Sequence, residues 1–180
     1  KNAGSSVTKV LADYIGVDRE DLRPQKHKFI SSREVPSVLN GKQDDYFIFT
    51  VIRNPWERTV SYFHYLQQIR QPPNNLSKDV KFANWVRAGG FRTLQTQMSQ
   101  LSDDFPCSVS RNIDYVARLE NLSEDWPKIC KKMGISCDMM HDKKSKHKHY
   151  SEYYNEVTKD IVYKFYKDDV QCLGYEFEKK

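Results

Sequence analysis

The amino-acid sequence predicts an α/β layered domain. The first observation is a continuous apolar run at residues 46–52, YFIFTVI, which is rich in aromatic and β-branched residues. Such a run fits a strand buried on both faces, as in a parallel sheet covered by helices. The second observation is another strand-like run, IDYVARL, at residues 113–119. The third is that helical patterns alternate with these runs, and 180 residues suffice for one compact domain.

The N-terminal part predicts a loop, a helix and a short strand. KNAGSSV, residues 1–7, is a small Gly- and Ser-rich turn, and the helix that follows it is expected to end at Gly16. HKFISS, residues 27–32, reads as a short strand. Ser31 and Glu34 then have the spacing of a capping box and predict a short helix. The apolar residues at helical spacing in the first helix are Val7, Val10, Leu11, Tyr14 and Ile15.

After the 46–52 strand, RNPWERTVSYFHYL predicts a further helix. Asn54 can cap it, Pro55 suits its first position, and Glu57 completes a capping box with Asn54. More helices are expected at about 78–88, 91–101 and 155–172, and another is expected to start at Ser123 or Asn121 and to end at Gly134. On the last of these, one side is expected to carry Val157, Ile161, Phe165 and Tyr166.

Composition narrows the classes of partner. The chain has 29 Lys and Arg against 24 Asp and Glu, and the net charge of +5 suits anionic ligands. The excess is too mild to indicate nucleic acid, and a soluble surface with a slight bias explains it equally well. Four scattered cysteines do not predict a metal site. Cys130 and Cys137 could form a disulfide across a turn. Glycosylation sequons occur at Asn75 and Asn121, although two sequons are easily met by chance in a chain of this length. No apolar run approaches membrane-spanning length.

The loop before the first helix offers groups that bind a phosphate. Backbone N–H groups of Ala3–Ser6 would lie at a helix N-terminus, where unpaired donors and the helix dipole favour an anion. Gly4 permits close approach of the backbone, while Ser5 and Ser6 add hydroxyl donors. Lys1 adds a mobile cation. The loop is not a Walker A motif, in which Lys directly follows the last Gly, and a Ser-capped helix without a ligand is the alternative.

A second candidate site follows the 46–52 strand. Arg53 lies at the carboxyl end of this strand, where ligands bind in open α/β sheets. Asn54, Arg58 and Ser61 fall at i, i+4 and i+7 on the next helix, so they share one face. A polar stripe at the mouth of a sheet is suited to a second phosphate. The alternative is a solvated helix face with an internal ion pair.

These segments together resemble the sulfotransferase family. KNAGSSV is similar to its 5′-phosphosulfate loop, and RNPWERTVSYF to its 3′-phosphate motif, an Arg at a strand end with a Ser eight residues later. VARLENL and KSKHKHYSEYYNEVTKDIVYKFYKDDVQCLGYEF resemble later blocks of the branch that includes carbohydrate sulfotransferases and bacterial relatives. The resemblance implies a three-layer fold like that of P-loop NTPases, with a central, mainly parallel sheet flanked by helices. It also implies a single sulfotransferase domain over residues 1–180.

The resemblance implies a function and a set of site residues. The cofactor would be 3′-phosphoadenosine 5′-phosphosulfate (PAPS), which leaves as PAP after its sulfuryl group passes to a hydroxyl or amine of a carbohydrate or small molecule. No metal and no nucleic acid would take part. Lys1 would stabilise charge on the leaving phosphate, Arg53 and Ser61 would bind the 3′-phosphate, and Leu119 and Glu120 would lie near the adenine. The 5′ end would be cradled by Lys1, Asn2, Ala3, Gly4, Ser5, Ser6 and Val7.

The general base is the point at which the sequence departs from the family pattern. Relatives often carry a His in an H-x-[ST]-x-x-[EQ] stretch, and Phe29 stands at that place here. His27, two residues earlier on the same side of the expected strand, is the candidate catalytic base, unless it is an ordinary His. Glu34 is a further candidate, although capping explains it as well. The basic segment at residues 141–149 is either an acceptor-binding or lid loop or a solvated loop.

Two other functions compete with this interpretation. A P-loop kinase or NTPase is disfavoured by the Lys–Gly order and by the lack of a carboxylate at the end of the buried strand. A non-catalytic module that binds anions or nucleic acid through the basic segment is the other. The resemblance further implies that the first core strand would precede Lys1, as in an N-terminally truncated member. The sequence leaves open the oligomeric state and the compartment: cytoplasm for a bacterial protein, or Golgi lumen if an upstream segment carries an anchor.

Overall fold

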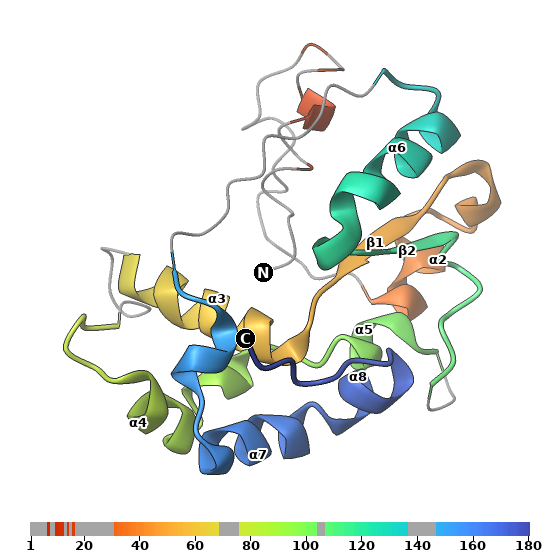
Figure 1. Ribbon diagram of the computed structural model, residues 1–180. Helices are drawn as coiled ribbons and strands as arrows, with labels where there is room; N and C mark the ends of the chain where they lie inside the picture. Colours follow the sequence, from red (N-terminus) through yellow and green to blue (C-terminus); the bar gives the residue numbers. More distant parts are fainter. Residues whose placement is uncertain are drawn as a thin grey trace. The chain divides into compact units, whose positions relative to one another are not determined.

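The computed structural model of the protein describes residues 31–68, 76–103, 107–136 and 147–180, together with Val7, residues 10–12, Tyr14 and Gly16. Helices and a small parallel sheet make up this part of the chain (Figure 1). The chain divides into two compact units, a strand-containing unit from residues 2–53 and 99–144 and a helical unit from residues 54–98 and 145–180. In the described ranges, no helix is long and apolar enough to cross a membrane.

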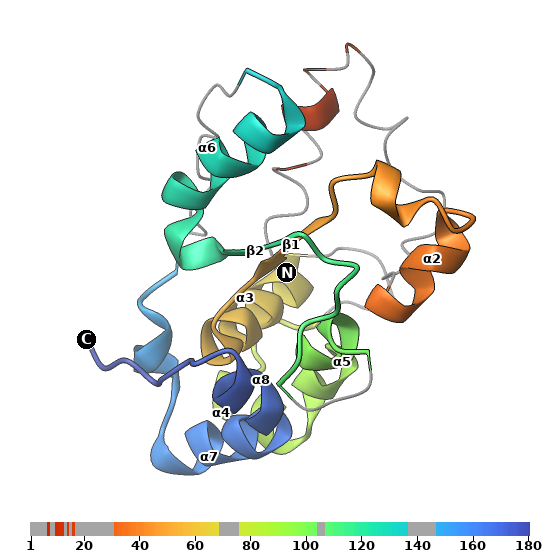
Figure 2. The ribbon, with the colours of Figure 1, turned by 90° about the vertical axis from the view of Figure 1, so that its right-hand side faces the viewer.

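The strand-containing unit is built on a parallel pair of strands. β1 (Phe49–Ile52) pairs with β2 (Tyr115–Arg118), with Phe49 opposite Tyr115 and Ile52 opposite Arg118. The backbone N–H of Asp114 donates to the carbonyl of Ile48 at 2.8 Å, so pairing continues before the strands. Helix α6 (Leu122–Met133) contacts β2 and runs beside it (Figure 2). Both predicted strands are therefore confirmed, although each is shorter than its apolar run.

The core of this unit lies between the strands and α6. Its buried members come from β1, from β2 and from one side of α6. The α6 members share one side because apolar residues on this helix recur every three to four positions. Val7 and Val10 of the N-terminal helical residues pack against the same cluster. The cluster comprises Val51, Ala117, Trp126, Ile129 and Cys130.

Short helices complete this part of the chain. The predicted capping box is confirmed, because the Glu34 carboxylate accepts from the backbone N–H of Ser31 at 2.9 Å. Helix α6 ends at Gly134, as predicted, and Gly134 has the left-handed φ of 67° that glycine accommodates without strain. The short elements are η1 (Ser32–Glu34), α2 (Val35–Val38), η2 (Gln43–Asp45), α5 (Met98–Leu101) and η4 (Leu119–Asn121).

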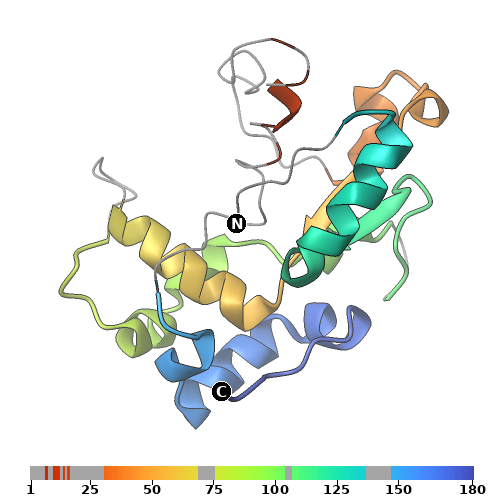
Figure 3. The ribbon, with the colours of Figure 1, turned by 45° about the horizontal axis from the view of Figure 1, so that its top comes forward.

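The helical unit packs around an aromatic core. Helices α3 and α4 both contact α7, which lies beside them in Figure 3. Phe63 is one member of the ring cluster, and its ring centroid lies 5.3 Å from those of both Phe82 and Trp85. Such ring pairs each add about 0.5–1.5 kcal/mol to the gain from burial. The elements are α3 (Pro55–Gln68), α4 (Phe82–Arg87), η3 (Gly90–Thr93), η5 (Tyr150–Tyr153), α7 (Glu156–Phe165) and α8 (Lys167–Cys172).

Several helix predictions need correction. The helix expected at 91–101 is two short helices, η3 and α5, separated by a turn at Gln95–Gln97. The helix expected at 155–172 is broken at Tyr166 into α7 and α8, and Val157 is exposed rather than packed. Of the strand expected at 27–32, the described residues 31–32 are not extended partners of a sheet, and the rest lies outside the described residues. Helix α4 begins later than expected, at Phe82.

The first helix is confirmed as far as the structure describes it. Val7, residues 10–12 and Tyr14 are helical, and the N–H of Gly16 donates to the carbonyl of Ala12 at 2.9 Å. Gly16 has a φ of 74°, the left-handed conformation expected after a helix. Tyr14 is exposed rather than part of a core, and Ile15 lies outside the described residues.

Candidate functional site

The phosphate loop predicted from the sequence lies almost wholly outside the described residues. This holds for Lys1, Asn2, Ala3, Gly4, Ser5, Ser6 and for the candidate base His27. Val7 is described: it is helical, half-buried and packed on the core of the strand-containing unit. The catalytic and 5′-binding roles of these residues therefore stay predictions.

Arg53 lies where the sequence places it. It directly follows β1, at the carboxyl end of a parallel strand, and the residue is only 7% exposed. Burying a guanidinium is costly without compensating hydrogen bonds and charges. Arg also presents planar, paired donors that match a phosphate. A buried Arg at this end of a parallel strand is therefore typical of an anion-binding position.

Asn54 caps helix α3, as predicted. Its side-chain Oδ1 accepts from the backbone N–H of Trp56 at 3.0 Å and of Glu57 at 3.4 Å. Pro55 is the first helical residue, where its missing N–H costs no hydrogen bond. The Nδ2 of Asn54 donates to the carbonyl of Glu176 at 3.0 Å. Both ends of this amide therefore serve the fold.

Arg58, the second member of the predicted polar stripe, is also held by the protein. The residue is 4% exposed, and its Nη1 donates to the carbonyl of Gln95 at 2.8 Å. Its guanidinium carbon lies 6.0 Å from the ring centroid of Tyr166. Asn54 and Ser61 are buried too, so the alternative of a solvated helix face is wrong. Asn54 and Arg58 of the stripe bind the protein itself, and Arg58 fixes the turn at Gln95.

Asp169 is a buried charged residue that the sequence analysis missed. It is fully buried in α8, and its carboxylate accepts from the backbone N–H of Gln97 at 2.8 Å and of Met98 at 2.7 Å. Burial raises the pKa of Asp169, while these two bonds and the charge of Arg58 act in the opposite direction. The sequence does carry one indication that Asp169 is buried, because it lies three residues after Tyr166, on the buried side of the last helices.

Ser61, the predicted partner of Arg53, lies in the second turn of α3 and is 8% exposed. The neighbouring Thr59 bonds back into its own helix, since its Oγ1 donates to the carbonyl of Pro55 at 2.8 Å. The phosphate site predicted from Arg53 and from the stripe of Asn54, Arg58 and Ser61 is thus divided. Asn54 and Arg58 support the fold, whereas Arg53 and Ser61 stay the candidates for binding.

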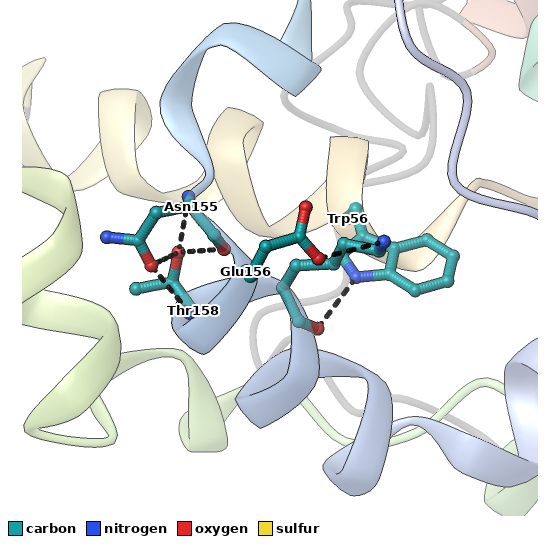
Figure 4. A network of polar contacts seen from close by, with 5 residues as sticks. Trp56, Asn155, Glu156 and Thr158 are labelled. Atoms are coloured by element: carbon teal, nitrogen blue, oxygen red, sulfur yellow. Dashed lines mark hydrogen bonds and ion pairs between the residues drawn. The ribbon is translucent and has the colours of Figure 1, made fainter.

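The first turn of α3 is anchored to α7 (Figure 4). The indole Nε1 of Trp56 donates to the carbonyl of Lys159 at 3.2 Å, and the hydroxyl of Tyr154 donates to the carbonyl of Trp56 at 2.9 Å. The start of α7 is itself fixed by a capping box, in which Thr158 N–H donates to Asn155 Oδ1 at 2.9 Å. Lys159 also pairs with Glu156 at 3.4 Å. The segment after Arg53 therefore starts from a rigid support.

At the end of the basic segment at 141–149, His147 and His149 are half-buried, whereas Lys148 is exposed. Of that segment, the structure describes residues 147–149. The ring of His147 stacks on that of His64 in α3, with centroids 5.2 Å apart and planes 8° apart, and Tyr153 meets the His64 ring edge-on. Burial, and then the charge of His147, lower the pKa of His64.

The remaining predicted positions follow β2. Leu119 packs on the core of the strand-containing unit, while Glu120 is exposed in η4. Their predicted place near an adenine is not tested by these contacts. Within the described ranges, no group of three or more His, Cys, Asp or Glu side chains is placed to hold a metal ion.

Comparisons with known proteins identify the family. The model of the sulfotransferase family matches residues 1–176. An uncharacterized protein from Archaeoglobus fulgidus is 28% identical over 92 residues, which are 51% of this chain and 71% of that relative. No solved structure matches. The resemblance seen in the sequence is thereby confirmed, and this chain belongs to the sulfotransferase family.

Proposed function

We propose that the protein transfers the sulfuryl group of PAPS to a hydroxyl or amine of a carbohydrate or small-molecule acceptor. The observation that supports this most is buried Arg53 at the carboxyl end of β1, in a chain that matches the sulfotransferase family over residues 1–176. In open α/β sheets, ligands bind at this edge, and Arg suits a phosphate. We propose further that the whole chain forms one three-layer domain of the kind found in P-loop NTPases.

The donors of the described residues fit a nucleotide that carries a second phosphate. Arg53 would supply two parallel N–H donors, and Ser61 one hydroxyl. Asn54 and Trp56 hold the start of α3 through bonds to Glu176 and Lys159, so the first turn of the helix that carries Ser61 is preorganised. Preorganised donors lose little entropy when an anion binds.

The proposed catalytic groups lie outside the described residues. PAPS, when bound, would supply the sulfuryl group and become PAP. Lys1 would place a cation beside the oxygen on which negative charge develops, and the N–H and hydroxyl groups of residues 2–7 would hold the 5′ end. His27 would accept the proton of the acceptor's hydroxyl or amine.

Ligand binding and turnover test this proposal together. Thermal unfolding is followed with PAP, with adenosine 5′-phosphate, with ATP and Mg²⁺, and with an oligonucleotide. A ligand at a hundred times its Kd stabilises the folded state by about 2.7 kcal/mol, which raises Tm by several degrees. We expect PAP to stabilise the protein most, and labelled sulfate to pass from PAPS to one member of a panel of sugars and hydroxyl compounds.

The other outcomes are distinct. Stabilisation by ATP and Mg²⁺ without an effect of PAP would indicate a kinase or NTPase. Oligonucleotide binding that weakens steeply with salt, again without PAP binding, would indicate a nucleic-acid-binding module. Either result would contradict the proposed sulfuryl transfer.

A further inference from the structure

We propose that Asn121 is a modification site that carries an N-linked oligosaccharide. Asn121, Leu122 and Ser123 form the acceptor pattern N-x-[ST] with a residue other than Pro in the middle. Sulfuryl transfer does not call for such a site, so the proposal goes beyond the proposed function. It depends on where the structure places these residues and on the state of the cysteines.

The acceptor residue lies at a turn on the surface of the strand-containing unit. Asn121 ends η4 and directly precedes α6, and both Asn121 and Ser123 are exposed. Leu122 between them packs toward the core cluster that contains Trp126 and Ile129. A bulky, hydrophilic oligosaccharide needs a surface position of this kind. The apolar side of α6 is in contact with the core, so the glycan would displace no packing.

The Asn121 side chain is not used by the helix that it precedes. An Asn at this position usually accepts a hydrogen bond from an N–H in the first turn, which stabilises the helix by about 0.5–2 kcal/mol. Asn121 makes no such capping bond. The start of α6 is held instead through Asp125, which accepts from the N–H of Arg118 at 3.0 Å and from the hydroxyl of Tyr115 at 2.8 Å. The Asn121 amide is therefore available for modification without loss of a cap.

The cysteines give an independent indication of the compartment. Cys107, Cys130 and Cys172 are each disulfide-bonded, and the described part of the chain holds no free thiol. Disulfides form and persist in oxidising compartments such as the lumen of the endoplasmic reticulum and the cell exterior. A sequon is meaningful in secreted proteins, because these pass through the compartment in which glycans are attached. The disulfides therefore indicate an oxidising compartment, in which a sequon such as that of Asn121 can be modified.

The chemistry is a substitution without oxidation or reduction. The co-reactant is an oligosaccharide linked to a polyprenyl pyrophosphate, and the catalyst is the oligosaccharide transferase of the host cell. The Nδ2 atom of Asn121 forms a bond with C1 of the first sugar, and the bond from C1 to the pyrophosphate oxygen breaks. Polyprenyl pyrophosphate leaves with the bonding electrons, and the amide nitrogen gives up one proton to a base of the transferase.

The test uses the full chain secreted from eukaryotic cells. Peptide-N-glycosidase releases N-linked glycans and leaves Asp where the modified Asn stood, and mass spectrometry of the peptides locates that change. We expect the conversion at position 121. Ser123→Ala should abolish it and Ser123→Thr should retain it, because the acceptor pattern needs a hydroxyl at that position. Ser123 is exposed, and circular dichroism checks that both variants fold alike.

The second sequon, at Asn75, lies outside the described residues, and the same digest reads it in parallel. Conversion at position 121, with or without conversion at 75, supports the proposal. An unmodified Asn121 in secreted protein whose cysteines are disulfide-linked would overturn it. If the protein is not secreted, the intracellular wild type is compared with Asn121→Gln. We then expect the glycosidase to convert position 121 in the wild type. The mass of the corresponding peptide of Asn121→Gln should not change.

Discussion

The backbone N–H of Gln97 donates a 2.8 Å hydrogen bond to the carboxylate of Asp169, 72 residues further along the chain. The next N–H, that of Met98, donates to the other carboxylate oxygen at 2.7 Å. Asp169 is fully buried, so these bonds lie out of reach of water. They fasten the turn before α5 to α8, while Arg58 of α3 holds the same turn through the carbonyl of Gln95.

We expect Asp169→Asn to destabilise the protein by about 1–3 kcal/mol, the usual cost of a buried polar group left without a partner. The amide has one acceptor oxygen, so one of the two N–H groups, of Gln97 or Met98, would face an NH₂ group instead. Asp168→Asn is the matched control, because Asp168 is the exposed neighbour and should change stability by less than about 0.5 kcal/mol. Urea unfolding measures both. Equal effects of the two changes would show that the buried bonds contribute little.

Local sequence rules predicted the parts of the fold that depend on local contacts. Asn54 as a cap, Pro55 as the first residue of α3 and Gly134 at the end of α6 each act within one helical turn. The predicted helices at 91–101 and 155–172 fail for a different reason. Bonds between distant residues fix their breaks: the hydroxyl of Tyr166 donates to the carbonyl of Leu94 at 3.2 Å, and Asp169 binds the turn at Gln97.

The predictions for the candidate site also succeed where they depend on local patterns and fail where they depend on distant residues. Arg53 was placed at a strand end by the apolar run before it, which is a local pattern. Whether Asn54 and Arg58 face a ligand or the protein depends on Glu176 and Gln95, which are 122 and 37 residues away from them. Helical spacing puts Asn54 and Arg58 on one face but does not reveal what covers that face.

The stacked pair of His64 and His147 predicts an acid-sensitive stability. Burial and the charge of His147 lower the pKa of His64, so the unfolded chain binds a proton more readily than the folded protein does. The stabilising contribution is therefore present above the ordinary His pKa of about 6.5 and is lost as pH falls through the lowered value. His64→Phe keeps a stacked ring without the charge and should lose less stability on acidification.

Urea unfolding of the wild type and His64→Phe at pH 7.5 and 5.5 compares these losses. The other rings near His64 are Phe63 and Tyr153, neither of which gains charge in this range. If both proteins lose the same free energy of unfolding between these two pH values, the stacked pair does not cause the acid sensitivity.

Gly90 has no room for a side chain. A Cβ atom built there would lie 2.1 Å from the indole nitrogen of Trp85, far closer than such atoms come in proteins. Gly90→Ala should therefore displace the buried Trp85 ring and destabilise the protein by about 1–3 kcal/mol. Gly134→Ala is the comparison, since its strain comes from a φ of 67° with nothing within 4 Å. Near-UV circular dichroism separates the two, because we expect only Gly90→Ala to alter the aromatic signal.

The proposed catalytic residues should act on turnover more than on binding. Lys1→Ala removes a cation from the place where negative charge develops, which typically costs on the order of 100-fold in rate. His27→Ala should lower turnover with little change in PAP affinity, and the loss should depend on pH near 6–7, where an ordinary His titrates. Steady-state kinetics with calorimetry for PAP measures both. Undiminished turnover in His27→Ala would turn the search to Glu34, His147 or His149.

Arg53 and Ser61 are expected to recognise the 3′-phosphate specifically. A guanidinium–phosphate contact is worth roughly 1.5–3 kcal/mol, so Arg53→Ala should weaken PAP binding by about one to two powers of ten. Ser61→Ala should cost about 1 kcal/mol. Neither change should much affect adenosine 5′-phosphate, which lacks the 3′ group. Arg53→Lys keeps the charge but loses the paired donors, and it should fall between the wild type and Arg53→Ala.

Arg58→Lys separates recognition from support of the fold. Arg58 is buried like Arg53 but donates to the carbonyl of Gln95, so its replacement should lower the free energy of unfolding without selecting between the two nucleotides. Calorimetry with PAP and adenosine 5′-phosphate on each variant, well below its Tm, gives the ratio of the two affinities. We expect that ratio to collapse in Arg53→Ala, to fall modestly in Ser61→Ala and to stay unchanged in Arg58→Lys. Equal losses for both nucleotides in Arg53→Ala would mean that Arg53 supports the fold, as Arg58 does, and that the 3′-phosphate is bound elsewhere.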